Sequence, residues 1–154
     1  MTLRLCLQTA CLMPGLPSKA DFRRWAGAAL EGRRELAEIT VRLVDEAESR
    51  KLNLDYRGYD RSTNILSFPW SVPKEFNSHF LGDLAICAPV VKREAVEQGK
   101  EPEAHWAHLV VHGVLHLLGF DHENLLDAEA MESQEISILG RLGYPNPYMD
   151  DDVV

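Results

Sequence analysis

The chain has 154 residues, of which 45% are hydrophobic and 26% are charged, and these values predict one globular domain spanning residues 1–154. Its formal net charge of −8 argues against a protein that coats nucleic acid through bulk positive charge, although a local basic groove is compatible with it. No apolar run approaches the roughly 20 residues that a membrane-spanning helix needs, so we expect no membrane association.

The first half of the chain alternates strand and helix signals. Leu3, Leu5 and Leu7 recur at every second position, which predicts a half-buried strand. Ser18 can cap a helix, with Asp21 placed three positions later at the positive end of the helix dipole. In chain order we expect a strand at 3–7, a helix from Ser18 to Gly32, a strand at 39–44, a short helix at 46–54 and an exposed loop at 56–63.

The second half is richer in helix signals, and its longest helix is apolar nearly all round. We expect a strand at 64–68, a loop or flap at 70–80, a strand at 81–87, and helices at 89–98, 103–118 and 127–142. The resulting order of elements predicts an α+β fold with a small mixed sheet packed by about five helices. The helix at 103–118 is the longest one and has almost no polar face, so we expect it to be central and buried.

Three histidines surround the end of this central helix, in the segment HGVLHLLGFDH. His112 and His116 are four residues apart, which places both rings on one face of a helix. Gly119 permits a left-handed turn that can return His122 to the same place. Three neutral imidazoles suit one Zn²⁺ ion and leave a fourth coordination position open for water, so the spacing predicts a catalytic zinc site. A closed structural metal site and three hydrogen-bonded core histidines are the alternatives.

The ligand spacing HxxxHxxGxxH is that of the metzincin peptidases, with one departure. Those enzymes carry a glutamate directly after the first histidine as their general base, and this chain has Gly113 there. A zinc metallopeptidase-like hydrolase is therefore an alternative that lacks its base in the expected place.

The segment HGVLHLLGFDH also resembles the signature of the YbeY family of bacterial metal-dependent endoribonucleases. Further stretches resemble other blocks of that family in the expected order, so that the resemblance runs from about residue 3 to Tyr148. These blocks are LNLDYRG at 52–58, STNILSFP at 62–69 and LGDLAIC at 81–87.

The resemblance implies a single-strand-specific endoribonuclease that acts in maturation of the 3′ end of 16S rRNA and in ribosome quality control. It further implies that His112, His116 and His122 bind one zinc ion, that Arg57 is functionally important, and that the partners are single-stranded rRNA and the ribosome or its proteins. A non-catalytic ribosome-associated factor with a structural metal is a third hypothesis. Three cysteines without a CxxC pair fit a cytoplasmic location, and we expect all three to be buried.

Several other residues are candidates for substrate contacts or for supporting the metal ligands. Arg57 could clamp a phosphate oxygen, or it could be an ordinary surface arginine. Asp121 could orient a ligand histidine or merely form a turn, and Asp83, Asn64 and His108 are further candidates. Phe68 and Trp70 could offer a face to an unpaired base, but we favour packing in the core.

Overall fold

A computed structural model describes residues 1–71 and 78–149 of the chain. The centre of the loop or flap expected at 70–80 lies outside these residues. The described chain contains nine elements in the order β-α-β-α-β-β-α-α-α, as the sequence predicts. They are β1 (Thr2–Thr9), α1 (Lys19–Leu30), β2 (Leu36–Val44), α2 (Glu46–Arg57), β3 (Ile65–Pro69), β4 (Phe80–Cys87), α3 (Ala88–Glu97), α4 (Pro102–Leu117) and α5 (Leu125–Leu142).

The strands form one mixed, open sheet in the order β1-β2-β4-β3. The β1–β2 and β2–β4 pairs are parallel, and each is linked by a connection that contains a helix. The β3–β4 pair is antiparallel, and β3 is an edge strand because it stands last in the strand order. This arrangement confirms the predicted α+β fold with a small mixed sheet.

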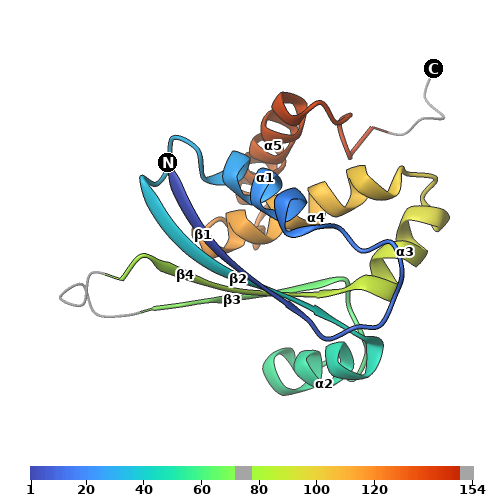
Figure 1. Cartoon of the computed structure of the whole chain (residues 1–154). Helices are drawn as coiled ribbons and strands as arrows, with labels where there is room; N and C mark the ends of the chain where they lie inside the picture. The colour runs from blue at the N-terminus through green and yellow to red at the C-terminus, as the bar shows by residue number, and fades with distance from the viewer. Residues whose placement is uncertain (72–77, 150–154) are drawn as a thin grey trace.

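The helices cover the sheet unequally. Figure 1 shows α1, α4 and α5 on one face of the sheet and α2 on the other. The helix α4 contacts β3, β4 and the three helices α1, α3 and α5, so it is the central helix that its apolar sequence predicts. Its Trp106 ring meets the edge of Phe22 from α1 at 5.8 Å between centroids, inside the main core. Among the described residues, none of the helices combines the length and hydropathy that a bilayer crossing needs.

The expectations for the end of α2 and for Cys6 are wrong. The helix α2 continues to Arg57, where we expected an exposed loop. Its length was not visible in the sequence, because its buried positions hold the polar residues Ser49 and Asn53 instead of an apolar stripe. Gly58 ends the helix with φ of 78°, a conformation that glycine adopts without steric cost. Cys6 is exposed, because it falls on the outward face of β1 between buried leucines.

The polar face of α2 holds the loop that follows it. The Ser49 hydroxyl donates to the carbonyl of Thr63 and accepts from its amide, each at 3.0 Å. The Asn53 side chain donates to the carbonyl of Arg61 at 2.9 Å. These bonds fix the path of the chain from the end of α2 into the edge strand β3.

Candidate metal centre

The histidine cluster begins on α4. His112 and His116 lie one turn apart on its last two turns, and their Nε2 atoms are 3.1 Å from each other. Both side chains are half-buried, whereas most of the other residues in the last two turns of α4 are fully buried. The helix thus presents two imidazoles side by side at the boundary between core and solvent.

The turn after α4 brings in the third histidine. Gly119 has φ of 102°, which reverses the chain just after the helix, and the amide of Phe120 donates to the carbonyl of Leu115 at 3.0 Å. The carboxylate of Asp121 accepts the amide of His122 at 2.7 Å and so shapes the turn. Asp121 therefore lies where it can hold the backbone of this turn.

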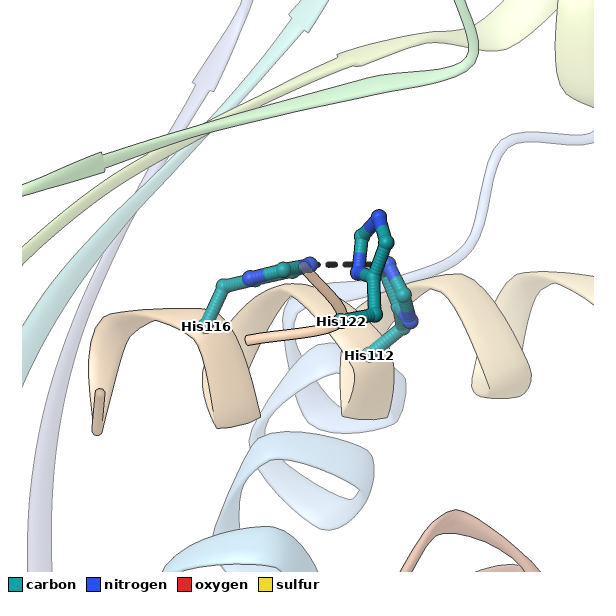
Figure 2. Close-up of side chains that lie close together, drawn as sticks. All are labelled: His112, His116 and His122. Atoms are coloured by element: carbon teal, nitrogen blue, oxygen red, sulfur yellow. Dashed lines mark hydrogen bonds between the residues drawn. The ribbon is translucent and has the colours of Figure 1, made fainter. Parts of the chain in front are cut away.

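The three rings converge, as Figure 2 shows. Their centroids are 4.6 Å apart for His112 and His116, 5.0 Å for His116 and His122, and 5.8 Å for His112 and His122. Each offers a nitrogen, and all three nitrogens lie within 4.8 Å of one another.

This donor set fits a zinc ion. Two nitrogens bound to a tetrahedral zinc ion at about 2.0–2.1 Å are about 3.3 Å apart, close to the spacing of His112 and His116. Burial lowers the pKa of His116 below its ordinary value, and the neighbouring imidazoles of His112 and His122 lower it further. The ring is therefore neutral at physiological pH, as a metal ligand must be.

The packing around position 113 explains why glycine, and not glutamate, follows the first histidine of the cluster. It is buried where α4 crosses the sheet, and a Cβ atom at this position would lie 2.6 Å from Ile65 Cδ1 and 2.9 Å from Leu84 Cδ2. A side chain at 113 would enter the packed layer between α4 and the sheet instead of the histidine cluster. A metzincin-type base is thus excluded at this position by packing as well as by sequence.

The histidines line a cavity of about 890 Å³ beside the edge strand. Its walls come from α4, the turn at 119–123, the start of β3, and the end of α2, where exposed Arg57 contributes its side chain. Asn64, Thr63 and Tyr148 complete the wall. The structure therefore brings Arg57 and the three histidines, which are distant in sequence, to one cavity.

The other candidates occupy different places. Asn64 lines the cavity, but its amide donates to Glu94 Oε1 at 3.1 Å, so its side chain is held by the protein. Asp83 lies in β4 opposite Phe68, and it is not among the described residues that line the cavity. Trp70 is exposed, against our expectation, while Phe68 is partly buried against Tyr56 at 4.6 Å between ring centroids.

A buried carboxylate behind the histidines was missed by the sequence reasoning. Glu135 of α5 is fully buried, and its Oε1 lies 2.5 Å from His112 Nδ1. Its Oε2 is 3.0 Å from His108 Nε2 and accepts a hydrogen bond from the hydroxyl of Tyr148. Burial alone would raise the pKa of Glu135, but the hydrogen bonds from His108, His112 and Tyr148 outweigh it and lower the pKa to about 2.

The signal for Glu135 is present in the sequence. The buried face of α5 reads Met131, Glu135, Ile138 and Leu139, so one acidic residue stands within an otherwise apolar stripe. A carboxylate in such a stripe needs a partner. Tyr148 gave no comparable signal, since it follows the last helix in an irregular segment.

Over most of its length the chain is similar to known proteins. A family model described as Endoribonuclease YbeY matches residues 17–143, a span that holds the three histidines, Arg57 and Glu135. The solution structure of TM1509 from Thermotoga maritima matches with a TM-score of 0.56 and 23% identity, covering 98% of this chain and 99% of that one. At this identity the likeness to the solved structure shows a shared fold.

Proposed function

The chain belongs to the YbeY endoribonuclease family, and from that membership we propose that it cuts single-stranded RNA with one zinc ion held by His112, His116 and His122. The observation that supports this most directly is the convergence of three imidazole nitrogens within 4.8 Å at the wall of an open cavity. A zinc ion at this place supplies a Lewis acid that lowers the pKa of water and polarises a phosphoryl oxygen.

Arg57 is proposed to hold the phosphate that is cut. Its guanidinium lies on the cavity wall at the end of α2, and two parallel N–H groups suit two oxygens of one phosphate. Such a contact stabilises the negative charge that develops during phosphodiester hydrolysis. Ser49 and Asn53 support this role indirectly, because they fix the loop that follows Arg57.

We propose that bases are held by aromatic faces instead of a broad basic surface, since the net charge is −8. Trp70 is 56% exposed directly after the edge strand, and Tyr56 is 68% exposed beside Arg57. Unpaired bases stack on such faces, whereas paired bases are already stacked within a duplex. This supports a preference for single strands.

The biological substrate that we propose is the 3′ end of 16S rRNA, in small-subunit maturation and ribosome quality control in the cytoplasm. The ribosome or one of its proteins would be the partner that presents the RNA. The family assignment carries this proposal, and the acidic charge of the chain agrees with a partner that supplies part of the RNA-binding surface.

Two alternatives make different predictions. A peptidase is disfavoured by the packing at Gly113. A non-catalytic factor with a structural metal is disfavoured by the open cavity and by the exposure of His122, because structural zinc sites are closed.

The test compares three substrates with the metal-loaded protein. A labelled single-stranded fragment of the rRNA 3′ end, the same fragment annealed to its complement, and casein are incubated with wild type and His112→Ala. We expect wild type to cut only the single strand and His112→Ala to cut nothing. Digestion of casein would support the peptidase, and intact RNA under all conditions would contradict the proposal.

A further inference from the structure

Glu135 contacts His108, His112 and Tyr148, which all line the cavity. Its carboxylate is fully buried, and it is not among the residues that line the cavity. Substrate in the cavity therefore has no direct route to this carboxylate, so any effect of Glu135 on the reaction must pass through the groups that it contacts.

The two nitrogens of the His112 ring face different partners. Nδ1 faces Glu135 Oε1 at 2.5 Å, and Nε2 faces His116 at the centre of the cluster. A carboxylate only accepts hydrogen bonds, so Nδ1 carries a proton, and in the neutral form of the ring Nε2 then keeps its lone pair. That is the tautomer which a metal ion at the cluster requires.

The negative charge of Glu135 also indicates a cation bound at His112. In the part of the chain that the structure describes, the ion-pair partners of Glu135 are histidines, His108 at 3.0 Å and His112, with no lysine or arginine among them. A buried carboxylate without a compensating cation is costly. A cation bound at Nε2 of His112 would compensate the negative charge of Glu135 through the imidazole ring.

We propose that Glu135 is the positioning residue of the metal centre: it fixes the tautomer and orientation of His112, while Tyr148 and His108 hold Glu135 in place. This inference rests on the proposed metal site. The hydroxyl of Tyr148 and the ring of His108 both approach Oε2, which leaves Oε1 to His112. His108, His112 and Glu135 also offer three ligand atoms within 4.8 Å, so a second ion at these residues is the competing explanation.

The test measures zinc affinity in a competition with a fluorescent chelator, together with zinc content, and needs no RNA. Glu135→Gln is compared with Glu94→Gln, a matched control that removes another carboxylate beside a histidine of α4. Glu94 Oε1 lies 3.0 Å from His105 Nε2, and neither residue belongs to the groups of side chains that could hold a metal ion among the described residues. Tyr148→Phe removes the hydroxyl that contacts Glu135 Oε2 and His108 Nε2 but leaves the contact of Oε1 with His112, so it serves as an intermediate variant.

We expect zinc affinity to fall about 10- to 100-fold in Glu135→Gln and less in Tyr148→Phe, and to be unchanged in Glu94→Gln. Nitrogen-15 spectra of the metal-free protein should show His112 protonated on Nδ1 in wild type and a mixture of tautomers in Glu135→Gln. An equal loss in Glu135→Gln and Glu94→Gln, unchanged affinity in Glu135→Gln, or two zinc ions per chain would overturn the proposal. Wild type that binds no zinc would instead overturn the proposed function.

Discussion

The packing of α4 on the sheet can be tested by adding one methyl group at Gly113. The new Cβ atom of Gly113→Ala would lie 2.6 Å from Ile65 Cδ1 and 2.9 Å from Leu84 Cδ2. Because Leu84 is fully buried, these side chains can yield only by moving their neighbours, and such overpacking costs about 1–3 kcal/mol. Replacing glycine by alanine in a helix contributes about 1 kcal/mol in the opposite direction.

Gly27→Ala in α1 is the matched control, because its Cβ atom meets nothing closer than Met1 Cε at 3.8 Å. Both variants gain the same helix propensity, so their difference isolates the packing cost. We expect Gly113→Ala to be less stable than Gly27→Ala by about 1–3 kcal/mol, or about 2–12 °C in Tm. The assay is thermal and urea unfolding of the metal-free proteins, followed by circular dichroism. Equal stability of the two variants would refute the reasoning and would show that position 113 has room for a larger residue.

Three further predictions concern the site. Arg57→Ala should change the free energy of unfolding by less than about 0.5 kcal/mol, because the residue is exposed. The same variant should lower kcat for RNA cleavage about 10²- to 10³-fold. An unchanged kcat would show that Arg57 takes no part in the mechanism. Chelation should abolish cleavage yet leave the circular dichroism spectrum intact, because the main core is built from apolar side chains, and added zinc should raise Tm; unfolding on chelation would favour a structural metal. The pKa of Glu135 falls from 4.5 to about 2 on folding, so its stabilising contribution is present above about pH 4.5 and is lost as the pH drops towards 2. The difference in urea stability between metal-free wild type and Glu135→Gln should therefore shrink over that pH range, and a constant difference would contradict the assigned cause.

The histidine cluster could be predicted from the sequence because its geometry is local. Helical spacing fixes His112 against His116, and the turn at Gly119 is short enough to place His122. The order of elements was predictable for the same reason, since the helices and strands have local periodicities and α1, α2 and α5 begin at side-chain caps. Ser18, for example, caps α1 as its position indicated, and it also forms a capping box with Asp21.

The features that were missed depend on contacts between distant parts of the chain. The length of α2 was underestimated because Ser49 and Asn53 are buried by hydrogen bonds to a loop, which no apolar stripe reveals. The pairing of β3 with β4, which places the cavity beside an edge strand, is likewise a long-range property. Glu135 left a local trace, but its partner His112 lies in another helix.

The most direct test of the account is a zinc titration of metal-free protein with cleavage of the single-stranded rRNA 3′-end fragment as the readout. We predict that cleavage by wild type rises in proportion to bound zinc and saturates at one ion per chain, and that His112→Ala remains inactive at every zinc concentration. Cleavage that is independent of bound zinc, or equal in wild type and His112→Ala, would contradict the claim that the three histidines form the catalytic centre.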